Sequence, residues 1–72
     1  MIEIYKTNVQ NSTQGKRLIN ALHTLFPFYR ANFDLHDCDN ILRIESTAGI
    51  IDDENIIRVM ETYGFVAEPL PD

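Results

Sequence analysis

The first residues of the chain alternate between apolar and polar side chains. Residues 2–7 read Ile-Glu-Ile-Tyr-Lys-Thr, and this period of two is typical of a strand with one buried face. The alternation predicts that Glu3 and Tyr5 point away from the core. The polar segment 8–15, interrupted by Val9, predicts a loop after this strand.

A longer period begins at Lys16 and predicts a helix. Its apolar side chains recur every three or four residues, as on one face of a helix: Leu18, Ala21, Leu22 and Leu25. Ser12 or Thr13 is suited to accept a backbone N–H at the start of this helix. Pro27 ends it, because proline has no N–H and disfavours helical geometry in the residue before it.

Residues 29–46 predict a β-hairpin. The side chains expected on its buried face are Ala31, Phe33, Leu35, Leu42 and Ile44. The intervening segment 36–40 is rich in Asp and Asn, which favour turns because their side chains hydrogen-bond to the nearby backbone.

Asp52, Asp53 and Glu54 predict the start of a second helix, because they supply an N-cap and negative charge at the positive end of the helix dipole. The apolar stripe of this helix comprises Ile56, Val59, Met60 and Tyr63. Gly64 suits the left-handed residue that follows many helices. Residues 65–68 then predict a last short strand.

The predicted order is strand, helix, strand, strand, helix, strand. With right-handed crossovers, this order gives a four-stranded antiparallel sheet with both helices on one face. We therefore expect an α+β fold, the ferredoxin-like βαββαβ open-faced sandwich, in a single domain spanning residues 1–72. The side chains expected on the uncovered face are Glu3, Tyr5, Asn32, Asp34, His36, Arg43 and Glu45.

Composition limits the kinds of partner and the cellular location that are expected for this chain. The chain carries 6 basic and 11 acidic side chains, for a net charge of −5 and a pI near 4.7. Nucleic acids and anionic membrane surfaces bind clustered Lys and Arg, so neither is expected as a partner. The apolar runs are far shorter than the ~20 residues of a membrane span, and the first residues do not resemble a signal peptide. Because the single cysteine cannot form an internal disulfide, we expect a cytoplasmic protein.

The chain resembles the heavy-metal-associated domain, the scaffold of copper chaperones and of the N-termini of metal-pumping ATPases. That family's pattern runs Gly-Met-x-Cys-x-x-Cys, then a helix with Ala-Leu, alternating strands, and a second helix that ends in Gly-Tyr. The matching residues here are Leu18-Ile19-Asn20-Ala21-Leu22, Phe28, Ala31, Phe33, Leu35, Ile56, Val59, Met60, Gly64 and Phe65. They share one register over nearly the whole chain, and the resemblance implies the same ferredoxin-like fold.

The departure from the family falls on its metal-binding loop. Counting back from Ala21-Leu22, Val9 stands at the methionine position, and Asn11 and Gln14 stand at the two cysteine positions. Copper(I) in such a loop needs two soft thiolates, whereas neutral amides are hard oxygen donors. We therefore expect no metal at Asn11 and Gln14, and no cofactor there.

His36 and Cys38 are an alternative candidate metal site. They are two residues apart in the predicted hairpin turn, at the end of the fold where the family keeps its metal, and they suggest weak copper or zinc binding. The competing interpretation is a solvated turn shaped by Asp37 and Asp39. These carboxylates also disfavour a thiolate at Cys38, so we expect no nucleophilic cysteine. Because the spacing gives no Ser-His-Asp or paired-carboxylate arrangement either, we expect no enzyme.

Two hypotheses follow. The first is a non-enzymatic module that binds a protein partner through the open sheet face or an edge strand, with Tyr5, Asp34, Asp37 and Asp39 as the candidate surface. The second is residual soft-metal or zinc binding or transport through Cys38 and His36, with a weak homodimer if two chains share the ion. The first is preferred, because the hydrophobic register is intact while the thiolate pair is absent.

Overall fold

The central strands of the sheet are β1 (Ile2–Thr7) and β3 (Ile41–Ser46), which pair antiparallel. β2 (Tyr29–Asp34) pairs with β3 on one side and β4 (Ala67–Pro69) pairs with β1 on the other, so the strand order is β2-β3-β1-β4. This computed structural model describes residues 1–34 and 40–71.

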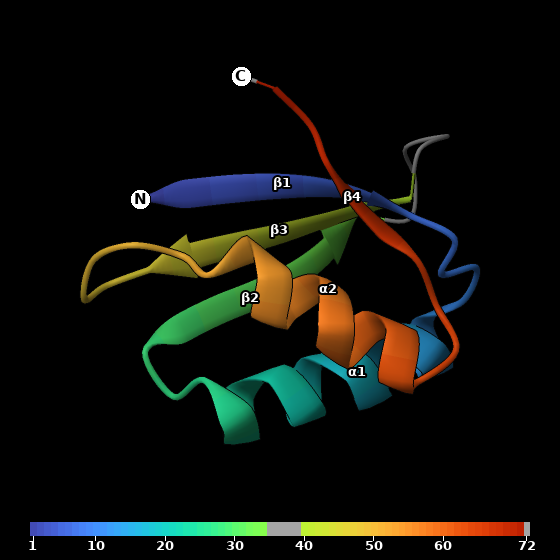
Figure 1. Cartoon of the computed structure of the whole chain (residues 1–72). Helices are drawn as coiled ribbons and strands as arrows, with labels where there is room; N and C mark the ends of the chain where they lie inside the picture. The colour runs from blue at the N-terminus through green and yellow to red at the C-terminus, as the bar shows by residue number, and fades with distance from the viewer. Residues whose placement is uncertain (35–39, 72) are drawn as a thin grey trace.

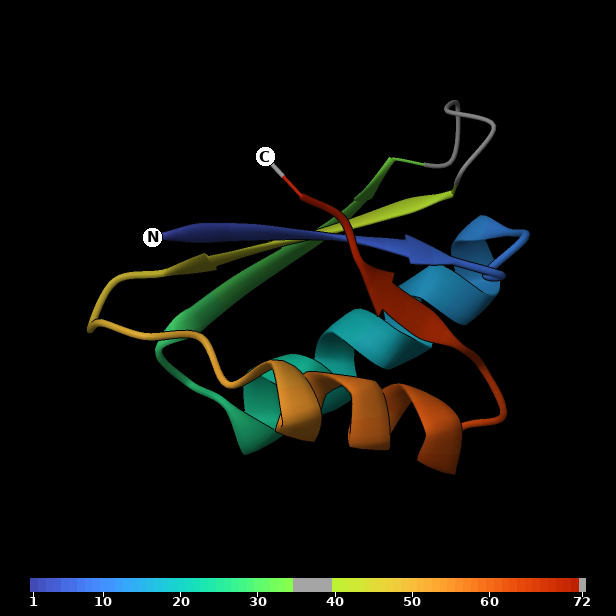
Figure 2. The same cartoon turned by 45° about the horizontal axis from the view of Figure 1, so that its top comes forward.

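Two helices complete the fold. Both α1 (Ser12–Leu25) and α2 (Asp53–Thr62) lie against the same face of the sheet, and the other face is left open (Figures 1 and 2). The order βαββαβ and the all-antiparallel sheet confirm the predicted α+β ferredoxin-like fold. The fourth strand, predicted over 65–68, is observed over 67–69.

α1 begins four residues before the position predicted from its apolar stripe. Asn11, rather than Ser12 or Thr13, is the N-cap, and its side chain accepts a hydrogen bond from the backbone N–H of Gln14. Gly15, predicted to lie in a loop, is buried in the first turn of the helix. A Cβ at Gly15 would lie 3.3 Å from Phe33 Cδ2, so the glycine allows α1 to pack closely on β2.

α2 has the predicted signals at both ends. The side chain of Asp52 accepts from the N–H of Asn55, which caps the start of the helix. At the other end Gly64 has a φ of 87°, and its N–H donates to the carbonyl of Glu61. The next N–H, of Phe65, reaches back to the carbonyl of Met60. This pair of bonds is the Schellman arrangement, in which glycine adopts the left-handed conformation at little cost.

The core lies between the sheet and the helices. Its buried apolar side chains are Tyr5, Val9, Leu18, Leu22, Ala31, Leu42, Ile44, Ile51, Ile56 and Met60. Phe33 packs against this cluster opposite Leu42, as predicted for the hairpin, while the predicted inward Leu35 lies outside the described residues.

The predicted orientation of β1 is wrong. Tyr5 pairs with Leu42 and Glu3 with Ile44, and cross-strand partners lie on the same face of a sheet. Because Leu42 and Ile44 are buried beneath the helices, Tyr5 is 0% exposed and Glu3 is half-buried. Ile2 and Ile4 therefore point to the open face. The alternation of apolar and polar residues could not show which face of β1 is buried, because the large aromatic residue Tyr5 stands among the positions that were predicted to be polar and outward.

The hydroxyl of Tyr5 has a partner that makes its burial tolerable. It donates a hydrogen bond to the carboxylate of Asp53 in the first turn of α2, which joins the central strand to the second helix. Burial raises the pKa of Tyr5 well above its ordinary value of 10, and the hydrogen bond to Asp53 and the negative charge of that carboxylate raise it further.

Two predicted core positions on the helices are also corrected. Leu25 is 57% exposed and Tyr63 is 45% exposed. Leu25 is the last residue of α1, and Tyr63 is the C-cap residue that follows α2. Both side chains therefore lie at the surface between the two helices.

Candidate functional site

The loop after β1 lies at the end of the molecule where the resemblance places a metal. The hydroxyl of Thr7 donates to the carbonyl of Asn40 at 2.6 Å, and the N–H of Val66 donates to Asn8 Oδ1 at 2.9 Å. These bonds bring the start of the loop, the start of β3 and the segment after α2 together, as the topology predicts. His36, Asp37, Cys38 and Asp39 lie outside the described residues.

The two residues at the family's cysteine positions take part in capping α1. Asn11 Oδ1 accepts the N–H of Gln14 at 2.9 Å, and Gln14 Oε1 accepts the N–H of Gln10 at 3.2 Å. The Asn11 oxygen thus satisfies a donor in the first turn that the helix cannot pair internally, and the Gln14 oxygen satisfies the N–H of the residue just before the N-cap. Neither residue supplies the charged sulfur that a soft ion requires, so this loop does not fit the family's copper(I) ion.

Over residues 1–34 and 40–71, no three or more His, Cys, Asp and Glu side chains gather closely enough to hold an ion.

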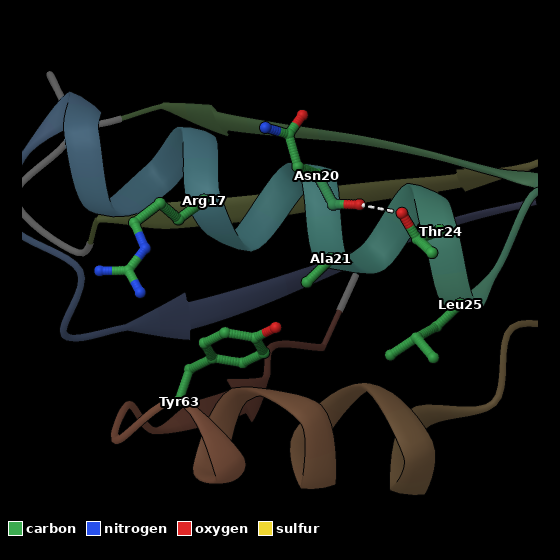
Figure 3. Close-up of a pocket in the computed structure, with 6 residues that line it drawn as sticks. All are labelled: Arg17, Asn20, Ala21, Thr24, Leu25 and Tyr63. Carbon is green, nitrogen blue, oxygen red and sulfur yellow. Dashed lines mark hydrogen bonds between the residues drawn. The ribbon is translucent and has the colours of Figure 1, made fainter.

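A groove runs between the two helices (Figure 3). It has a volume of about 470 Å³ and is lined by Arg17, Asn20, Ala21, Thr24, Leu25 and Tyr63. Tyr63 extends from the end of α2 toward α1, and the Thr24 hydroxyl is occupied by a bond to the carbonyl of Asn20 at 2.9 Å. This lining offers no carboxylate, histidine or thiol, and its polar groups are those of Arg17, Asn20, Thr24 and Tyr63.

The open face of the sheet is the more distinctive surface. Alternation and register place Ile2, Ile4 and Lys6 of β1 on it, beside Ile41, Arg43 and Glu45 of β3. Ile2 is 41% and Ile4 is 37% exposed. Leu70 joins them beyond β4, because its N–H donates to the carbonyl of Ile4 at 2.8 Å.

A shallow groove of about 540 Å³ lies on the open face. Its lining comprises Ile4, Asn32, Phe33, Asp34, Ile41, Arg43 and Leu70. An apolar strip with polar borders on a face that no helix covers is typical of an interaction surface.

The open face is electrically balanced, unlike the chain as a whole. Among the residues that the structure describes, its charged side chains are Lys6, Arg30, Arg43, Asp34, Glu45 and Glu68, which gives three of each sign. The described residues outside this face include five acidic and three basic side chains.

The predicted interaction residues are only partly found on this face. Asp34 is exposed at the end of β2, on the open side, as are Asn32, Arg43 and Glu45. Tyr5 is not available to a partner, because it is buried in the core on the opposite side of the sheet. Sequence reasoning missed Ile2, Ile4 and Leu70. The sequence did not show which face of β1 is buried, because this depends on contacts with α2, a helix that lies far from β1 in the sequence.

The two edges of the sheet are less accessible to a partner strand. On β2 the N–H of Ala31 donates to His23 Nε2 at 3.2 Å, so α1 occupies one of the amides along that edge. The other edge strand, β4, is three residues long and ends at Pro69, which has no N–H. Strand addition, the second mode considered for a partner, is therefore disfavoured relative to the open face.

No family model, curated protein or solved structure matches this chain. Within the part of the chain that the structure describes, neither helix has the length and apolar character needed to cross a membrane.

Proposed function

We propose that this chain is a non-enzymatic protein-binding module, built on a scaffold like that of the heavy-metal-associated domain, and that the open sheet face contacts the partner. One observation carries the proposal. Ile2, Ile4, Ile41 and Leu70 gather on the uncovered face of the sheet, where a protein with no partner would gain more from polar side chains.

The residues of the metal-binding loop also favour a protein-binding role over metal delivery. A carrier of soft ions needs its ligands unengaged and charged, whereas Asn11 and Gln14 are neutral and hold the first turn of α1. The scaffold is therefore proposed to serve for binding protein rather than for delivering copper.

Metal titration tests the loss of the metal site. Under reducing conditions, and against a competing chelator, the protein is expected to take up no copper(I) or zinc with micromolar or tighter affinity, because two thiolates are missing. One-to-one uptake that Cys38→Ser abolishes would contradict the proposal and establish the alternative site at Cys38 and His36.

Restoring the thiolates provides the positive arm of this titration. In a Cys38→Ser background, the double variant Asn11→Cys, Gln14→Cys is expected to bind one copper(I) ion if the loop has kept the family's geometry. The matched control, Thr13→Cys with Lys16→Cys, has the same spacing two residues further along and is expected to bind more weakly. Equal affinity of the two variants would argue against the resemblance.

Site-specific photocrosslinking tests the binding surface. A photoreactive amino acid at Asn32, which is exposed on the open face, is expected to yield a discrete covalent adduct with a protein in cells that express the chain. The control places the same amino acid at Leu25, in the groove between the helices. Adducts from Leu25 alone would move the proposed surface to the helical side, and adducts from neither position would contradict a protein-binding role.

A further inference from the structure

We propose that the protein bound by the open sheet face is a second copy of this chain, joined face to face in a weak homodimer. This inference rests on the proposed function, since it identifies the partner of the same surface. The argument comes from the charge balance of the face, its apolar strip and its area.

A two-fold symmetric interface brings a surface against itself, so each patch has to contain both partners of every charge pair. The open face meets this condition with three cationic and three anionic side chains: Lys6, Arg30, Arg43, Asp34, Glu45 and Glu68. The other described residues include five acidic and three basic side chains, so they carry a net negative charge and would repel the same surface of a second copy. The open face is therefore where two copies approach with least repulsion.

The apolar strip supplies the attraction. Ile4 lies near the middle of the face, next to Arg43 across the strand pair and beside Leu70, with Ile41 lining the same groove. Packing two such strips together removes apolar surface from water on both copies, which stabilises the pair by roughly 25 cal/mol for each Å² buried.

The area of the face sets the strength of the dimer. Three strands of six residues and one of three, spaced ~4.8 Å apart, cover roughly 340 Å². Two copies therefore bury about 700 Å² in total, which is below the ~1,200 Å² of stable specific interfaces and corresponds to a weak, transient dimer. A dissociation constant between about 10 µM and 1 mM is the corresponding expectation.

Salt distinguishes a second copy from a basic partner. Two chains of charge −5 repel each other at long range, and this repulsion is screened when the Debye length falls from ~30 Å at 0.01 M to ~8 Å at 0.15 M salt. Self-association is therefore expected to strengthen as salt is added. Binding to a cationic protein would weaken under the same change.

The experiment is sedimentation equilibrium of the full chain from 10 µM to 1 mM, at low and physiological salt. The parent is expected to dimerise, and more strongly at the higher salt concentration. Arg43→Glu, on the open face, is expected to weaken the dimer at least tenfold, because it disturbs the balance of charge on both copies. Arg17→Glu makes the same change in net charge in the groove between the helices, and it is expected to leave the dimer almost unchanged. Ile4→Asp provides a second test on the face, with circular dichroism to check folding.

Three outcomes would overturn the inference: a monomer at 1 mM in physiological salt, equal weakening by Arg43→Glu and Arg17→Glu, or a dimer that Ile4→Asp leaves intact. A monomeric parent that still yields an adduct with a different protein from Asn32 would refute the homodimer and keep the protein-binding module. The failures of the two proposals are thus distinguishable.

Discussion

Tyr5→Ala is expected to lower the free energy of unfolding by about 3–5 kcal/mol, enough to unfold much of the protein at room temperature. The substitution removes an aromatic ring that is 0% exposed and leaves a cavity between the sheet and α2. It also deprives the Asp53 carboxylate of its hydrogen-bond donor. Urea denaturation followed by circular dichroism measures the loss.

Ile4→Ala is the matched control on the same strand. Ile4 is 37% exposed on the open face, so its truncation is expected to cost about 1 kcal/mol or less. The ranking of the two variants tests the orientation of β1. If Ile4→Ala proved the more destabilising, Tyr5 would lie at the surface and the open face described above would be the buried one.

A steep loss of stability in alkali is the second large effect expected. Burial raises the pKa of Tyr5 in the folded protein, and its bond to Asp53 adds to the effect, whereas in the unfolded chain the phenol ionises near 10. Below pH 10 both states keep the proton and the folded state loses nothing. Above pH 10 the unfolded chain releases its proton while the folded chain retains it, so stability falls by about 1.4 kcal/mol per pH unit.

Two phenylalanine variants isolate this effect in unfolding measurements from pH 8 to 12. Tyr5→Phe removes the ionising group and is expected to flatten the alkaline slope, although it starts from a lower stability because Asp53 loses its donor. Tyr63→Phe changes a tyrosine that is 45% exposed and is expected to keep the parent slope. An unchanged slope in Tyr5→Phe would show that the alkaline loss arises elsewhere.

The sequence predicted the element order and the topology because these depend on local signals. The change from a period of two to a period near 3.6, the cap at Asp52 and the glycine at position 64 each fix an element or its end without distant contacts. The start of α1 was mispredicted although its signal was present: Asn11-x-x-Gln14 has the spacing of a capping pair.

The site depended on information that the sequence does not contain locally. Tyr5 is buried in the core, where its ring packs with residues distant in the sequence and its hydroxyl donates to Asp53, 48 positions away. A one-residue change of facing moved Ile2 and Ile4 to the open face and removed Tyr5 from it. The substitution of amides for thiolates at Asn11 and Gln14, in contrast, was evident from residue identity alone, because metal preference follows from the donor atom.

The hydrogen bond between His23 and Ala31 affects how readily the edge strand β2 can pair with another chain. An unprotected outer strand can template the endless addition of further chains and lead to fibrils. Here His23 of α1 accepts the outward N–H of Ala31, so a strand that pairs along β2 would have to displace His23 from that amide. Variants that weaken the docking of α1 are therefore expected to be more prone to strand addition at this edge.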